Sequence, residues 1–99
     1  MIPLSPEAEA HLDALREHFE RLDRPEATRN LIIALGRAAE RIETNPRSGL
    51  PAPRPYPSLS SLGLLWTKSG SYWFAYTLAP AGPIIASVFH DTADIPNRV

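Results

Sequence analysis

The chain has 99 residues, a formal net charge of −1 and no cysteine. This length suits one domain, and a hydrophobic content of 43% is typical of a globular fold rather than a disordered one. The missing cysteine excludes a disulfide framework, thiolate metal ligands and a cysteine nucleophile. A chain that mainly grips phosphate backbones would carry a basic excess, so direct nucleic-acid binding is not expected. No signal peptide or membrane-length apolar run is visible, and we expect a cytoplasmic protein.

Two amphipathic helices are predicted in the first half of the chain. The segment Ser5-Pro6-Glu7 is a helix start, with a capping serine, a proline suited to the first turn and an acid at the positive end of the dipole. Apolar residues recurring every three or four positions predict helices over residues 6–22 and 25–45. The second helix ends at Asn45-Pro46, because the residue before a proline is pushed out of the helical region. The short connection predicts an antiparallel hairpin.

The second half of the chain is predicted to form a loop and then a sheet. Residues 47–61 are rich in proline, serine and glycine and are expected to be a long loop. Three strand-like runs follow, separated by short turns, at residues 62–68, 71–79 and 84–90. With a short strand at residues 1–4, the predicted fold is α+β in the order β-α-α-β-β-β. An antiparallel helix hairpin would pack on one face of a small antiparallel sheet.

The predicted strands carry apolar residues on both of their faces. A two-helix hairpin covers one face, so we expect Trp73 and Phe89, on the other, to stay partly exposed as a partner site. An alternative remains open, in which the loop over residues 47–61 or the tail folds over that face. Ile32 widens the apolar surface of the second helix. The predicted surface for a partner or target comprises Ile32, Trp66, Lys68, Trp73, Phe89 and Arg98.

Neither a metal site nor a catalytic triad is predicted. His11 and His18 lie seven positions apart on one side of the first helix, but no further ligands are evident. Ser87 and His90 lie three apart on a predicted strand and would point to opposite faces, which argues against a triad with Asp94. We therefore expect no metal, no cofactor and no catalytic residue, and His90 is expected to close the strand end by bonding to the backbone.

Four short segments occur in an order typical of a known family. Leu4-Ser5-Pro6-Glu7-Ala8 resembles an "L-S/T-P-x-A" opening, and the segment from Glu43 to Gly49 resembles "E-N-P-x-x-G". Tyr72-Trp73-Phe74-Ala75-Tyr76 resembles "Y-R-I-x-Y", and the segment from Ile85 to Ile95 resembles "I-x-R-V-x-H-x-x-R-D-I". Together they resemble the RelE/ParE superfamily of small bacterial toxins over nearly the whole chain. The β-α-α-β-β-β layout of that family is also the one predicted from periodicity.

The resemblance implies one of two activities. RelE-like members cleave mRNA on the ribosome, ParE-like members poison DNA gyrase, and an antitoxin encoded beside the toxin neutralises both. Ribonuclease members use basic residues around the sheet as acid, base and phosphate clamps. Here Lys68 is the only cation in the three strand runs, and the expected arginines are replaced by Trp73, Thr77, Ser87 and Ala93. These departures favour the ParE-like branch, a toxin that binds DNA gyrase without cleaving bonds and is held by a cognate antitoxin.

Two alternatives stay open. A RelE-like ribosome-dependent mRNA endonuclease would have to rely on Arg54, Lys68, His90 and Arg98. An inert relative would only bind an antitoxin. In the favoured interpretation the chain is not an enzyme, and it has no membrane partner.

Overall fold

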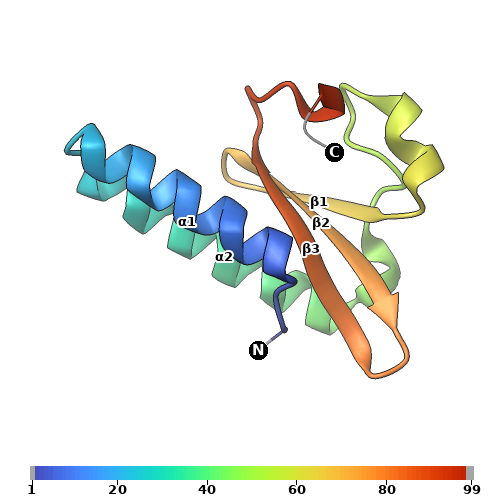
Figure 1. Cartoon of the computed structure of the whole chain (residues 1–99). Helices are drawn as coiled ribbons and strands as arrows, with labels where there is room; N and C mark the ends of the chain where they lie inside the picture. Colours follow the sequence, from blue (N-terminus) through green and yellow to red (C-terminus); the bar gives the residue numbers. More distant parts are fainter. Residues whose placement is uncertain (1, 98–99) are drawn as a thin grey trace.

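The regular structure consists of two helices and three strands, α1 (Pro6–Arg21), α2 (Pro25–Thr44), β1 (Leu65–Ser69), β2 (Tyr72–Ala79) and β3 (Gly82–His90) (Figure 1). The computed structural model describes residues 2–97. The predicted α+β fold is confirmed, because an antiparallel sheet in the order β1-β2-β3 carries the helix hairpin on one face. The loop between α2 and β1 contains two short 3-10 helices, Pro46–Ser48 and Pro57–Leu62. The tail after β3 contains a third, Ile95–Asn97. No helix of this range is long and apolar enough to cross a membrane.

The ends of α1 and α2 follow the capping signals in the sequence. Ser5 caps α1, since its Oγ accepts a hydrogen bond from Ala8 N at 3.1 Å. The same hydroxyl donates to Ala86 O at 2.8 Å, so the cap also fastens the start of α1 to β3. Asp23 turns the chain between the helices in a left-handed conformation, with a φ of 52°. The helix hairpin extends well beyond the sheet (Figure 1).

The predicted strand at residues 1–4 is reduced to one parallel bridge, between Leu4 and Ile85. The predicted start of the first sheet strand at residue 62 is also wrong. Residues Pro57–Leu62 instead form a 3-10 helix, which Gly63 ends with a φ of 70°, so β1 begins only at Leu65.

A β-bulge changes which residues of β3 face the helices. Pairing of β2 with β3 passes from Ala75 opposite Ser87 to Tyr76 opposite Ile85, which leaves Ala86 as the extra residue. Strict alternation would place Ile85 and Val88 on opposite faces. Because of the bulge, both belong to the core beneath the helices.

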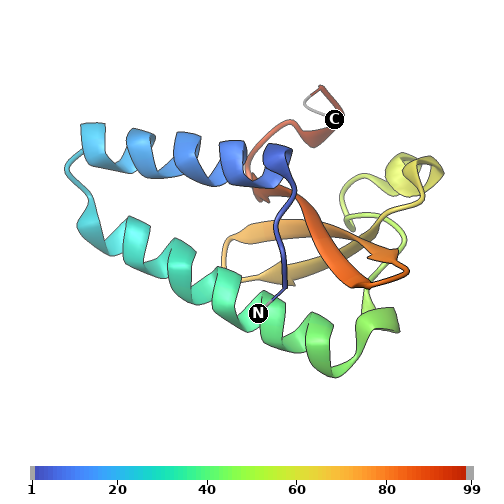
Figure 2. The same ribbon diagram turned by 60° about the horizontal axis from the view of Figure 1, so that its bottom comes forward.

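Two hydrophobic cores lie on the two faces of the sheet. The helix-side core joins Leu31, Ala38 and Ile42 of α2 to Phe74 and Tyr76 of β2, all at most 1% exposed. The second core lies between the sheet and the layer formed by the loop and the tail (Figure 2). Its buried members are Leu59, Trp66, Trp73, Ala75, Phe89 and Ile95.

Candidate functional site

The second face of the sheet is closed, and the expectation that Trp73 and Phe89 stay partly exposed there is wrong. Trp73 is 2% exposed and Phe89 is 4% exposed. The alternative prediction, that the loop or the tail covers this face, is confirmed. Both segments contribute. Leu59 packs over this face from the loop and Ile95 packs from the tail. Burial removes the apolar area from water, so this face is core rather than a partner site.

The other predicted binding residues differ in their exposure. Ile32 lies on α2 with 58% of its surface exposed, far more than the buried Trp66 of β1, which is 0% exposed. The indole Nε1 of Trp66 is buried and makes no hydrogen bond within the described residues. Lys68, also on β1, is exposed. Arg98 lies outside the described residues. Of the five predicted residues that the structure describes, Trp66, Lys68 and Trp73 line one recess beside β1. Ile32 and Phe89 do not line it, so the five do not form one surface.

Both edges of the sheet are already occupied by other parts of the chain. On the β1 side, Leu50 and Trp66 exchange two backbone hydrogen bonds of 2.7 Å. On the β3 side, Ile85 N donates to Pro3 O at 3.1 Å, and Ile85 O accepts from Ser5 N at 2.8 Å. An added strand needs unpaired backbone groups at an edge. A partner strand could pair at these positions only by displacing residues of this chain.

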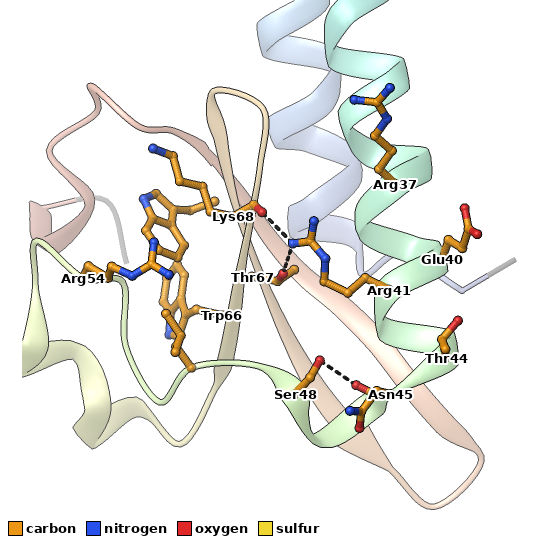
Figure 3. Close-up of a pocket in the computed structure, with 12 residues that line it drawn as sticks. Arg37, Glu40, Arg41, Thr44, Asn45, Ser48, Arg54, Trp66, Thr67 and Lys68 are labelled. Carbon is orange, nitrogen blue, oxygen red and sulfur yellow. Dashed lines mark hydrogen bonds between the residues drawn. The ribbon is translucent and has the colours of Figure 1, made fainter.

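Positive charge gathers instead in a recess beside β1. The recess has a volume of about 650 Å³, and Arg37 and Arg41 of α2 line one side of it. Arg54 of the loop and Lys68 of β1 lie on the other side (Figure 3). Glu40 is the one acid in the lining. We refer to Arg37, Arg41, Arg54 and Lys68 as the cationic recess.

Arg41 is held in place by the sheet. Its Nη1 donates to Thr67 Oγ1 at 2.7 Å and to Lys68 O at 2.6 Å, as the dashed lines in Figure 3 show. Thr67, which provides the first of these acceptors, is a buried residue with 6% exposure, so the bond has a buried anchor. Hydrogen bonds from an ionised donor are among the stronger ones in proteins. The guanidinium group of Arg41 is therefore fixed at the point where α2 meets β1.

The cations of the recess are poorly neutralised. No salt bridge among residues 2–97 involves Arg37, Arg41 or Arg54. Lys68 Nζ lies 3.5 Å from Asp91 Oδ2, with both side chains partly exposed. Four cations, less Glu40 in the lining and Asp91 beside Lys68, leave a local formal charge of about +2. Such an excess favours an anionic ligand.

The titratable side chains at the end of β3 form a small polar cluster next to Lys68. His90 Nδ1 lies 2.7 Å from Thr92 Oγ1 and accepts a hydrogen bond from Thr92 N at 3.2 Å, so the expectation that His90 bonds to the backbone at the strand end is confirmed. Asp91 Oδ1 is 3.2 Å from the same nitrogen. Tyr72 meets the His90 ring edge-on, with centroids 5.2 Å apart. Burial, and then the negative charge of Asp91, raise the pKa of the Tyr72 phenol.

His11 has a structural role. Its Nδ1 accepts a hydrogen bond from Val88 N at 3.2 Å, and its ring centroid is 4.9 Å from that of Phe89. This histidine therefore joins α1 to β3. No group of three or more His, Cys, Asp or Glu side chains among residues 2–97 is placed to hold a metal ion.

Arg37 and Arg41 were missed as candidates because they were treated as solvated helix charges. Their spacing is a signal that could have found them. The two arginines are four positions apart and therefore share one side of α2, next to the buried Ala34 and Ala38 that contact the sheet layer. Charged residues that border a buried helix face lie close to whatever that face packs on. Here the neighbour is the β1 edge.

The sequence matches no family model and no curated protein.

Proposed function

We propose that this chain is a ParE-like toxin of a type II toxin–antitoxin system, which binds DNA gyrase in the cytoplasm and is neutralised by a cognate antitoxin. The observation that carries the proposal is the character of the second sheet face. Ribonuclease activity of the RelE type needs an acid, a base and phosphate-binding cations together around the sheet. The cations of this chain lie in the recess beside β1, and the sheet face itself is filled by Trp66, Trp73 and Phe89, all at most 4% exposed. A toxin with such a sheet acts by binding.

The contacts between the four family-like segments support the proposal at the level of the fold. The opening segment contacts the last one, because Ser5 bonds to Ile85 and Ala86. The segment after α2 contacts the central strand, because Tyr76 Oη donates to Pro46 O at 2.7 Å and accepts from Gly49 N at 2.9 Å. Residues that resemble a family pattern thus fasten the start of α1 to β3 and the loop to β2. These roles are structural, and a binding protein would need them as much as an enzyme.

The antitoxin surface that we propose lies on the helix hairpin. Ile32 and Ile33 are 58% and 44% exposed, although isoleucine is usually buried. The helix hairpin reaches beyond the sheet (Figure 2). Among the described residues, Leu62 and Leu78 are exposed singly elsewhere, whereas Ile32 and Ile33 are adjacent on the helix hairpin, where an antitoxin would cover them together.

The second candidate function, a ribosome-dependent mRNA endonuclease, is favoured by the cationic recess. Arg54 and Lys68, two of the residues on which such an enzyme would rely, line it together. His90, the remaining described candidate for acid–base catalysis, does not line the recess and is engaged by Thr92 and Asp91. The lining offers Glu40 as its one carboxylate and no histidine, whereas cleavage through the 2′-hydroxyl needs both an acid and a base. We therefore rank this function second.

The test combines two activity assays on the purified protein, with and without the protein encoded by the neighbouring gene. We expect inhibition of gyrase supercoiling that the neighbour relieves, and intact mRNA in a ribosome-bound cleavage assay. Cleaved mRNA would replace the proposal by the RelE-like function. No effect in either assay, together with normal growth on expression alone, would identify an inert relative.

A matched pair of variants tests the antitoxin surface. Ile32→Asp places a charge in the proposed interface, and we expect it to abolish neutralisation while gyrase inhibition persists. Leu78→Asp is the control. Leu78 is also exposed, at 41%, but it lies near the end of β2 and not on the helix hairpin. Equal loss of neutralisation in both variants would argue against a surface on α2.

A further inference from the structure

We propose that the cationic recess is a binding site for phosphate groups, either of a free phosphate compound or of a nucleic-acid backbone. The site is distinct from the proposed antitoxin surface, and the inference does not rest on the proposed function. It starts from the position of four cations drawn from three parts of the chain: Arg37 and Arg41 from α2, Arg54 from the loop and Lys68 from β1.

The fold holds these cations together despite their mutual repulsion. Arg37 and Arg41 are one helical turn apart, a spacing at which like charges destabilise a helix. Arg54 reaches the same recess from a segment anchored by the backbone pair between Leu50 and Trp66. None of the three arginines has an ion-pair partner among the described residues. An anion bound between the two sides would relieve this repulsion.

Arg41 supplies the preorganised donor of the site. Both hydrogen bonds that its guanidinium makes within the described residues are donated by Nη1, to Thr67 Oγ1 and to Lys68 O. The donors on Nη2 and Nε have no partner among residues 2–97 and remain available to a ligand. A planar guanidinium fixed in this way can present two parallel N–H groups, the geometry that matches two oxygens of a phosphate.

The charge of the recess favours phosphate over a carboxylate. The local formal charge is about +2 once Glu40 and Asp91 are counted against the four cations. A phosphate monoester carries roughly −1.5 to −2 at neutral pH, and two adjacent diesters of a nucleic-acid backbone carry about −2 between them. A carboxylate carries one negative charge. A phosphate monoester or a pair of backbone phosphates therefore neutralises the site more completely.

The burial of the two tryptophans in the lining indicates that the recess recognises the phosphate of a ligand and not a nucleic-acid base. Trp66 and Trp73 line the recess, but they are 0% and 2% exposed. Stacking of a base needs an open aromatic face, as in proteins that bind single strands. These indoles therefore form the floor of the recess, and the ligand is held through its charge and oxygens. Binding should consequently be insensitive to base sequence.

The experiment titrates the full chain with inorganic pyrophosphate at constant ionic strength, followed by backbone and arginine side-chain NMR signals. We expect saturable shifts centred on Thr67, Lys68 and the Nε–H of Arg41. A parallel titration with a short single-stranded oligonucleotide separates the two sources. Tighter binding of the oligonucleotide than of pyrophosphate would identify a nucleic-acid backbone, and the reverse order would identify a free phosphate compound.

Matched double variants test the location of the site. Arg37→Gln with Arg54→Gln removes two cations of the recess, and we expect pyrophosphate affinity to fall about tenfold or more. Arg16→Gln with Arg47→Gln removes the same charge from residues outside the recess and should bind like the wild type. Urea denaturation midpoints equal to that of the wild type would show that both double variants fold.

Three results would overturn the proposal. Pyrophosphate shifts that do not saturate would show that there is no site. Equal loss of affinity in the two double variants would show attraction to overall charge rather than to the recess. Competition by a glutamate-rich peptide at the same concentration as pyrophosphate would assign the recess to an acidic protein partner instead.

Discussion

Replacing Tyr76 by phenylalanine tests how the loop is fastened to the sheet. The Tyr76 side chain is 0% exposed, and its hydroxyl bonds to Pro46 O at 2.7 Å and Gly49 N at 2.9 Å. Phenylalanine keeps the ring but leaves both half-buried backbone groups without a partner, at about 1 kcal/mol each. We expect the free energy of unfolding to fall by about 2 kcal/mol. In a domain of this size that loss lowers the melting temperature by roughly 8–16 °C.

The assay is urea denaturation followed by tryptophan fluorescence, with Tyr56→Phe as the control. The hydroxyl of Tyr56 lies 3.4 Å from Ala93 O, longer than an ordinary O–H···O bond. Its loss should change the free energy of unfolding by less than about 0.5 kcal/mol. If the Tyr76 variant were as stable as the Tyr56 variant, the anchoring of residues 46–49 by this hydroxyl would be refuted.

Three further predictions concern the second core, the loop and alkaline pH. Ile95→Ala should lower the free energy of unfolding by about 2–5 kcal/mol in urea denaturation, because Ile95 is fully buried under the sheet; no change would mean that the tail leaves this face open. Gly49→Ala should destabilise the protein in a thermal melt, since a Cβ there would lie 2.9 Å from Leu65 Cβ; wild-type stability would contradict that close contact. The raised pKa of Tyr72 in the folded state means that the unfolded state loses its phenolic proton first, near pH 10, so stability falls as pH rises from there through the folded pKa. Tyr72→Phe should flatten this loss in denaturation curves from about pH 9 to about pH 11, and an unchanged slope would refute it.

The helices and the strand order were predictable because they depend on local signals. The cap at Ser5 and the proline after Asn45 act within one turn, and periodicity then marks the two helices between them. The bulge at Ala86 was not predictable, since it depends on how β3 pairs with β2 and on the bonds of the opening segment to Ile85 and Ala86. Those contacts join residues about 80 positions apart. No local pattern encodes them.

The candidate site was harder to predict than the fold. Apolar residues on both faces of the strands indicated that something covers the second face, and Trp73 and Phe89 were correctly placed together there. The pattern could not say whether a partner or this chain provides the cover. Leu59 and Ile95 provide the cover from segments in which the apolar residues show no clear periodicity. Their 3-10 helices are too short for a periodic pattern to develop.

The closed second face separates stability from binding in this molecule. Trp66, Trp73 and Phe89 would have served both purposes on an open sheet, and a substitution there would have weakened folding and binding together. As core residues they contribute first to folding, although Trp66 and Trp73 also form the floor of the cationic recess. The two surfaces that we propose for ligands, Ile32 on α2 and the cationic recess, consist of exposed side chains on elements that are fastened elsewhere. Each can be altered without unfolding the protein, and because they involve different residues, loss of antitoxin binding and loss of phosphate binding should be separable by single substitutions.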